Sequence, residues 1–179
     1  MSRFRMNDSS GYCFAPSSKV LKADGSRVSI EGLQKGDLVW TPSGPSTVLA
    51  IVECGRYSYA HTMCNIDGVC VSPWYPFRRK GGGWIRPIDM FERYDCILTK
   101  VYAIALDNYH CIDINGLEFP TLGHGFEEPV VEHSYFGSNR VIEGLKNLPG
   151  WDAGRPVFVN FTVNYDRVTG EINGWFDLV

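Results

Sequence analysis

Three turn dipeptides, each set between runs of strand-forming residues, constrain this chain more than any other feature of its sequence. They are Asp24-Gly25, Asp67-Gly68 and Asn115-Gly116. Asp-Gly and Asn-Gly tolerate the positive φ angles that the two-residue turns of β-hairpins require. Runs such as TVLAIVEC (47–54) and KVYAIAL (100–106) are rich in apolar and β-branched residues, as buried strands are. The pattern predicts a mostly β chain with several hairpins.

One segment near the C-terminus breaks the strand pattern. In NRVIEGLKNLPG (139–150), four apolar residues recur at the spacing of one helical face. They are Val141, Ile142, Leu145 and Leu148. Asn139 is available as the N-terminal cap, and Pro149-Gly150 can stop the helix. The sequence therefore predicts one short helix near residues 139–148, followed by alternating strand-like sequence.

Charge and hydropathy argue against two classes of protein. The formal net charge is −3, and residues 126–179 carry four Lys/Arg against eight Asp/Glu, so only residues 1–125 are slightly basic. Such a balance is a poor match for a nucleic-acid-binding protein. No apolar run reaches membrane-spanning length, and we expect no membrane span. A length of 179 residues suits one domain, with or without an appendage.

The six cysteines are irregularly spaced and too sparse for a disulfide scaffold. His61, Cys64 and Cys70 fit no standard zinc-ligand spacing, so we expect no metal site and no cofactor. Cys13 stands apart because it follows a polar stretch (1–11) and precedes the first hairpin. A thiol there is either inert packing or a nucleophile for the carbonyl of Tyr12, converting the peptide to a thioester by an N-to-S acyl shift.

Three ordered blocks carry a resemblance to a known family. CFAPSSKVLKADGSRVSIEGLQKGDLV (13–39) resembles the opening block of the Hint family, the self-processing domain of inteins and hedgehog proteins. SPWYPF (72–77) with GGGWIRP (81–87) resembles the second block, and residues 101–125 resemble the last. The residues of these later blocks most resemble the Vint branch. Its members are Hint domains that lie C-terminal to von Willebrand factor A-type domains in larger proteins.

The resemblance implies a horseshoe-like Hint fold of paired β-hairpins. It covers residue 13 to about residue 137, which implies three parts. These are an upstream tail (1–12), a Hint core (13–137) and a C-terminal extension (138–179) with one short helix and strands. The extension corresponds to the adduct-recognition region of hedgehog relatives. The substrate would be the flanking N-terminal domain, expected to be of the von Willebrand factor A type.

By resemblance, Cys13 is the nucleophile and Tyr12–Cys13 is the scissile bond. Ser72 occupies the place of a threonine that holds the scissile amide. Tyr75 occupies the place of a histidine that protonates the departing nitrogen. It is either a structural aromatic residue of a strand or a catalytic residue, and in the catalytic role we expect its hydroxyl to reach that nitrogen. A phenol has a pKa of ~10, so it is a poor proton shuttle at neutral pH. The catalytic set implied is Cys13, Ser72 and Tyr75, with His110 and His124 as further proton-transfer candidates.

Gly125 stands where splicing needs an Asn or Gln side chain, so the resemblance implies hedgehog-like cleavage or ligation without splicing. Water or a small external nucleophile would then resolve the thioester. The alternative is a catalytically impaired Hint-fold module that binds a lipid, a polysaccharide or a protein. A basic cluster is either a solvated hairpin tip or a site for heparin-like sulfated polysaccharide. Its members are Arg78, Arg79, Lys80 and Arg86.

Overall fold

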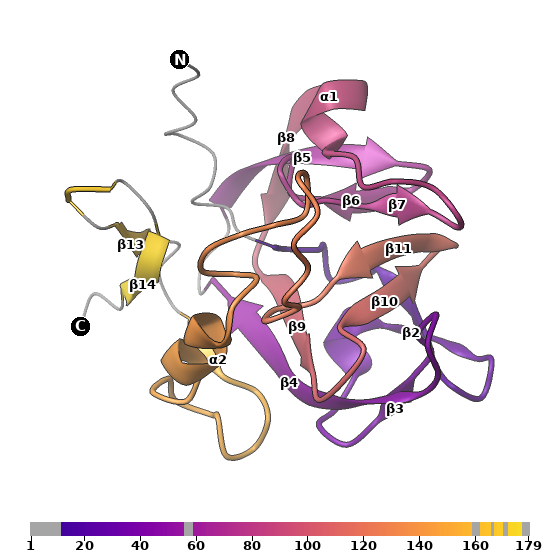
Figure 1. Ribbon diagram of the computed structural model, residues 1–179, viewed down its shortest axis with the longest axis horizontal. Helices are drawn as coiled ribbons and strands as arrows, with labels where there is room; N and C mark the ends of the chain where they lie inside the picture. The colour runs from indigo at the N-terminus through magenta and orange to yellow at the C-terminus, as the bar shows by residue number, and fades with distance from the viewer. Residues whose placement is uncertain (1–11, 56–58, 159–161, 166, 170–171, 177–179) are drawn as a thin grey trace.

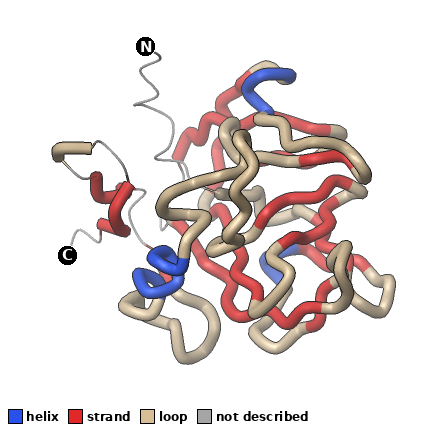
Figure 2. Tube along the Cα trace, in the orientation of Figure 1, coloured by secondary structure: helices blue, strands red, loops and turns tan. Residues whose placement is uncertain are grey.

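The computed structural model describes residues 12–55, 59–158, 162–165, 167–169 and 172–176. Strands dominate this part of the chain, and its two α-helices are short (Figures 1 and 2). They are α1 (Pro87–Met90) and α2 (Asn139–Leu145), with one 3-10 turn at Ile30–Gly32. The prediction of a mostly β fold with one short C-terminal helix is confirmed. The single turn of α1 was not anticipated.

A five-stranded sheet contains two of the three predicted hairpins. Its strand order is β2 (Arg27–Ser29), β1 (Lys19–Leu21), β10 (Cys111–Ile114), β11 (Leu117–Pro120) and β7 (Arg78–Arg79). Gly25 has a φ angle of 88° in the first turn, and Asn115 and Gly116 have φ angles of 57° and 83° in the second. Asn115-Gly116 therefore makes the two-residue turn that its dipeptide predicted. At Asp24-Gly25 the hairpin is present but its turn is longer: Lys22 donates to the Ser26 carbonyl, and only Gly25 has a positive φ.

Two further sheets complete the body of the domain. One contains β12 (Val157–Phe158), β4 (Ser46–Cys54) and β3 (Leu38–Val39), with β9 (Val101–Leu106) also paired to β4. The other runs β6 (Val69–Val71), β5 (Tyr59–Ile66) and β8 (Arg93–Leu98), and Asp67-Gly68 makes its β5–β6 turn. Every residue of β9 is buried, which explains why its sequence is a continuous apolar run and does not alternate.

The N-terminal cap of helix α2 lies one residue earlier than the sequence predicted. Ser138, not the expected Asn139, is the N-terminal cap, and its hydroxyl accepts a hydrogen bond from the amide of Arg140 at 3.3 Å. Val141 and Leu145 are buried on the inward face, as the helical spacing predicted. The apolar face of α2 therefore joins the main core.

The segment after α2 returns to the core and adds β12 in parallel beside β4. The amides of Ile51 and Glu53 donate to the carbonyls of Gly154 and Pro156, both at 2.9 Å. Gly154 has a φ of +72°, and a Cβ there would lie 2.3 Å from the Cβ of Lys35. Glycine is needed at this close approach. Part of the predicted extension is thus built into the core sheet, while its boundary at residue 138 stays a prediction.

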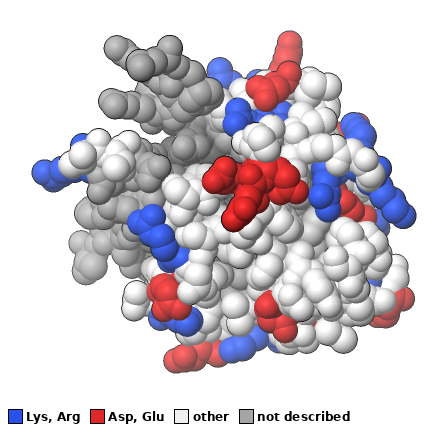
Figure 3. Space-filling model, in the orientation of Figure 1, with Lys and Arg blue, Asp and Glu red and all other residues white. Residues whose placement is uncertain are grey.

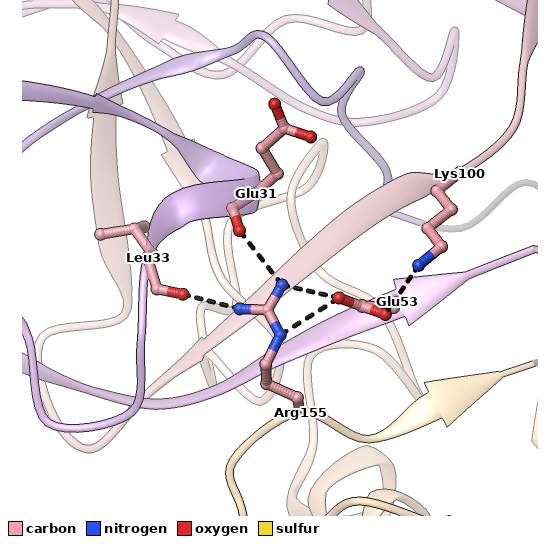
Figure 4. A network of polar contacts seen from close by, with 5 residues as sticks. All are labelled: Glu31, Leu33, Glu53, Lys100 and Arg155. Atoms are coloured by element: carbon pink, nitrogen blue, oxygen red, sulfur yellow. Dashed lines mark hydrogen bonds and ion pairs between the residues drawn. The ribbon is translucent and has the colours of Figure 1, made fainter.

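Arg155 ties this returning segment to two earlier parts of the chain (Figure 4). Its Nη1 donates to the carbonyl of Leu33 at 2.7 Å, and its Nη2 donates to Glu53 Oε1 at 2.6 Å. Nη2 also reaches the carbonyl of Glu31 at 3.1 Å, and Lys100 bonds the other oxygen of Glu53 at 3.2 Å. Burial raises the pKa of Glu53, but hydrogen bonds from Arg155 and Lys100 outweigh burial and lower it.

The last hairpin pairs β13 (Thr162–Tyr165) with β14 (Ile172–Phe176). Its strand side chains lie outside the residues whose side chains are described. Within the described residues, none of the helices is long and apolar enough to span a membrane.

Candidate active site

Cys13 lies on a short extended segment that joins two sheets. Phe14 makes antiparallel bridges to both Val71 of β6 and Tyr102 of β9. Its amide donates to Tyr102 O at 2.8 Å, and the amide of Ala15 donates to Cys70 O at 3.1 Å. The segment is therefore held from both sides, and Cys13 itself is 5% exposed. The nucleophile candidate sits in the interior of the fold and not at a loose edge.

Ser72 contacts the scissile amide directly. The Cys13 N–H donates to Ser72 Oγ at 3.1 Å, and Ser72 Oγ donates to the Cys13 carbonyl at 3.1 Å. The Ser72 amide also donates to that carbonyl at 3.0 Å. The nitrogen of Cys13 is the leaving atom of the Tyr12–Cys13 bond. The hydroxyl therefore touches the atom that must gain a proton if this bond breaks.

A second thiol, which the sequence did not single out, lies beside the nucleophile candidate. Cys54, at the end of β4, is hydrogen-bonded to the Cys13 side chain, and this bond, followed by burial, raises the pKa of Cys54 well above its ordinary value. Cys54 is therefore a neutral thiol next to the sulfur of Cys13. All six cysteines are free.

Tyr75 does not place its hydroxyl at the scissile nitrogen. The hydroxyl donates to the carbonyl of Pro120, while the Cys13 N–H is taken by Ser72. Burial, and next the neighbouring Tyr12 and Cys13, raise the pKa of Tyr75 well above its ordinary value. The ring of Tyr75 stacks on the side chain of Tyr12, and the expected bond from its hydroxyl to the scissile nitrogen is replaced by the bond to Pro120.

The side chain of Tyr12 is enclosed by aromatic rings. It stacks on Tyr75 with ring centroids 4.4 Å apart and planes 12° apart. Phe136 and His124 lie at centroid distances of 5.3 Å and 6.0 Å, and His133 packs edge-to-face at a centroid distance of 6.1 Å. Tyr12 is 4% exposed, so this residue of the predicted tail belongs to the core.

Two histidines in this enclosure are held in the neutral form. Nδ1 of His124 accepts the Phe126 amide at 2.9 Å, and Nδ1 of His133 accepts the Tyr135 and Phe136 amides at 3.1 and 3.0 Å. These bonds assign the ring proton to Nε2 in both residues. Burial lowers the pKa of both imidazoles to about 4, with His133 and then His110 adding to the effect on His124.

The comparisons with known proteins agree with this architecture. The family of Vint Hint domains matches residues 12–174. The chain belongs to this family. The match includes both Tyr12 and most of the extension, so it reaches past both ends of the predicted core (13–137).

Solved structures with a similar fold are inteins and an intein-like domain. The gp41-1 intein is 15% identical with a TM-score of 0.47, covering 63% of this chain and 100% of the intein. The DnaB intein from Synechocystis sp. PCC 6803 is 13% identical with a TM-score of 0.49, covering 62% and 99%. A bacterial intein-like domain from Clostridium thermocellum is 20% identical with a TM-score of 0.45, covering 61% and 97%. No curated protein matches the chain.

His110 lies close enough to His124 to help lower the pKa of that imidazole. Burial lowers its pKa, which Asp107 partly offsets. Its Nδ1 and the Oγ1 of Thr121 are buried without a hydrogen-bond partner among the described residues. The Thr121 amide donates to the His110 carbonyl at 2.9 Å, which joins the two residues. His110 and His124 stay candidates for proton transfer, and neither is hydrogen-bonded to the scissile amide in the described part of the chain.

The basic cluster is partly neutralised by acidic partners. Arg78 bonds Glu118 at 2.8 Å and lies over the ring of Trp84, with its guanidinium carbon 4.4 Å from the ring centroid. Arg79 bonds Asp67 at 2.8 Å. Figure 3 also shows acidic side chains gathered over the loop that follows β11, whose exposed acidic residues are Glu127, Glu128 and Glu132. Polyanion binding stays a prediction. The acidic partners of Arg78 and Arg79 reduce the positive charge that this cluster can offer to a ligand.

The loop between β11 and α2 contributes residues whose role the sequence did not indicate. Val131, His133 and Phe136 come from this loop and contact Tyr12. They are not part of the nucleophile block or the second block, and nothing in their spacing shows that they face Tyr12. Among the described residues, no group of three His, Cys, Asp or Glu side chains is arranged to hold a metal ion.

Proposed function

We propose that this Vint Hint domain cleaves its own chain at Tyr12–Cys13 through a thioester, without splicing. The observation that carries the proposal is the contact of Ser72 Oγ with the Cys13 amide nitrogen at 3.1 Å. The Ser72 hydroxyl at the leaving nitrogen can assist proton transfer, and the Cys13 thiol supplies the nucleophile, which are the two functions that an N-to-S acyl shift uses.

In the first step, the Cys13 sulfur attacks the carbonyl carbon of Tyr12. A C–S bond forms, the C–N bond breaks, and the proton lost by the thiol is delivered to the Cys13 amine. Ser72 Oγ lies 3.1 Å from that nitrogen, so its hydroxyl can relay this proton once it turns from the Cys13 carbonyl to donate to the amine. Cys54 keeps its own proton and is hydrogen-bonded to the Cys13 side chain, so a neutral thiol lies beside the attacking sulfur.

In the second step, water or a small external nucleophile attacks the thioester carbonyl and releases the segment that ends at Tyr12. Gly125 follows His124 and has no side chain to cyclise, so the C-terminal side stays intact. In a longer natural protein, the released segment would be the domain that precedes residue 13, which we propose to be of the von Willebrand factor A type.

A second candidate function is a Hint-fold binding module with little cleavage activity. The protonation states favour it: the Tyr75 proton is committed to Pro120, and His124 and His133 are neutral with pKa values of about 4. Neither histidine is a strong proton donor at neutral pH. Such a module would retain the Tyr12–Cys13 bond and recognise a lipid, a polysaccharide or a protein.

Thiol-induced cleavage separates these two functions. The parent chain and three variants (Cys13→Ala, Ser72→Ala and Ser72→Thr) are incubated with dithiothreitol at pH 7, and intact masses are followed with time. Under the first function, the parent and Ser72→Thr lose residues 1–12, Cys13→Ala loses nothing, and Ser72→Ala is at least tenfold slower. An unchanged parent mass supports the binding module.

A further inference from the structure

We propose that the domain recognises the side chain that precedes the scissile bond, and that Tyr12 is selected by a dedicated subsite. The Tyr12 subsite consists of Tyr75, His124, Val131, His133 and Phe136. The proposal rests on the proposed cleavage at Tyr12–Cys13, and it assigns the unusual Tyr75 to substrate recognition rather than to proton transfer.

The apolar part of the subsite fits an aromatic ring. Tyr75 offers one flat face, with ring centroids 4.4 Å apart and planes 12° apart. Phe136 is tilted by 32° at 5.3 Å and closes another side. Aromatic pairs at such distances attract each other beyond the effect of the area that they bury. A small residue at position 12 would leave this space empty.

The polar part of the subsite fits a phenol hydroxyl. Because Nδ1 of His124 accepts a backbone amide, its Nε2–H is the donor toward Tyr12 Oη, 3.4 Å away. The Tyr12 hydroxyl donates in turn to the carbonyl of Val131 at 3.4 Å. One donor and one acceptor, both in a buried setting, match the two capacities of a hydroxyl group.

Binding of the side chain also positions the reacting groups. Tyr12 and Cys13 are adjacent, so fixing the ring of Tyr12 on one side and the Phe14 backbone on the other restricts the scissile carbonyl between them. Such orientation lowers the barrier for attack by the neighbouring thiol. The loop between β11 and α2 thus sets the specificity of a reaction whose nucleophile lies more than 100 residues earlier.

A substitution series at position 12 tests the proposal in the full chain. Tyr12→Phe removes only the hydroxyl, Tyr12→Leu keeps apolar bulk without a flat ring, and Tyr12→Ala empties the subsite. We expect dithiothreitol-induced cleavage to slow about threefold to tenfold for Phe, and by more than tenfold for Leu and Ala. Equal rates across the four chains would overturn the subsite, since the Cys13 chemistry would then be indifferent to the residue before it.

A second readout does not depend on cleavage. The series is made in the Cys13→Ala background, and the imidazole signals of His124 are titrated by NMR. In Tyr12→Ala, water reaches the imidazole and its titration midpoint should rise by at least one pH unit, while His61 on β5 serves as the unaffected control. A parent chain that never cleaves would overturn the proposed function, but the titration would still test the subsite. An unchanged titration midpoint of His124 in Tyr12→Ala would overturn the subsite.

Discussion

Tyr75 shows how one residue changes role when its neighbours are known. The family resemblance places it at a proton-donor position, but its hydroxyl is bonded to Pro120 and its ring is stacked on Tyr12. Both contacts are side-chain directions, which the spacing of a motif does not specify. The sequence therefore located the residue correctly in the region of Cys13 without indicating what its ring and its hydroxyl touch.

Tyr75→Phe separates the two roles. The variant keeps the ring but leaves the buried Pro120 carbonyl without its donor, which should lower the free energy of unfolding by about 1–3 kcal/mol. Dithiothreitol-induced cleavage should change by less than about threefold, because the hydroxyl does not serve the scissile amide. Chemical denaturation and mass spectrometry measure the two quantities. If cleavage instead slowed by about 10²-fold to 10⁴-fold, the factor that a general acid contributes to a rate, Tyr75 would have a catalytic role.

At the scale of elements, the hairpins were the most predictable part of the fold. Asp67-Gly68 and Asn115-Gly116 specify two-residue turns by local backbone preference alone, and the structure has both. The parallel pairing of β12 with β4 was not predictable in this way. It joins residues about 100 positions apart and depends on Arg155 and on a close approach at Gly154. The local sequence of β12 or β4 does not indicate which distant strand it pairs with.

Arg155→Ala tests how firmly the extension is attached to the core. The variant removes bonds to Glu53 and to two backbone carbonyls, and charge-assisted bonds of this kind contribute about 1.5–3 kcal/mol. We expect the free energy of unfolding to fall by about 2 kcal/mol and the amides of Ile51 and Glu53 to exchange faster with deuterium. Lys146→Ala is the matched control, because its pair with Glu143 is exposed and should contribute little to stability. Equal effects of the two variants would show that Arg155 is no anchor.

At the scale of the whole molecule, the two neutral histidines link stability to pH. The pKa values of His124 and His133 are about 4, below the unfolded value of ~6.5. Between these values the unfolded chain binds more protons than the folded chain, so stability is full above pH ~6.5 and falls as pH drops toward 4. Each histidine contributes up to about 1.4 kcal/mol per pH unit in this window.

His133→Asn provides the comparison. The Asn side-chain oxygen can accept the same backbone amides as Nδ1 but does not titrate. Thermal melts from pH 7 to pH 4.5 should show a smaller loss of Tm for His133→Asn than for the parent, since one proton-binding group is gone. Parallel curves for the two chains would mean that His133 titrates normally in the folded protein.

The site as a whole was only partly readable from the sequence. Cys13 and Ser72 were found because they stand at fixed places in blocks of the family, and the structure brings them into contact. The enclosure of Tyr12 was missed because it is assembled from three distant segments, and a tyrosine after a polar stretch carries no sign of burial. Cys54 was missed for the same reason, as its place beside Cys13 follows from the pairing of β4 with β9 and of β9 with the Phe14 segment.

The central claim is that a thioester forms between Tyr12 and Cys13, and hydroxylamine tests it most directly. This nucleophile captures a thioester as a hydroxamate, and high-resolution mass spectrometry identifies the new chain end. We predict one fragment of residues 1–12 ending in a hydroxamate on Tyr12, a complementary fragment beginning with a free amine at Cys13, and neither from Cys13→Ala. An intact chain, a break at another bond, or the same fragments from Cys13→Ala would contradict the account.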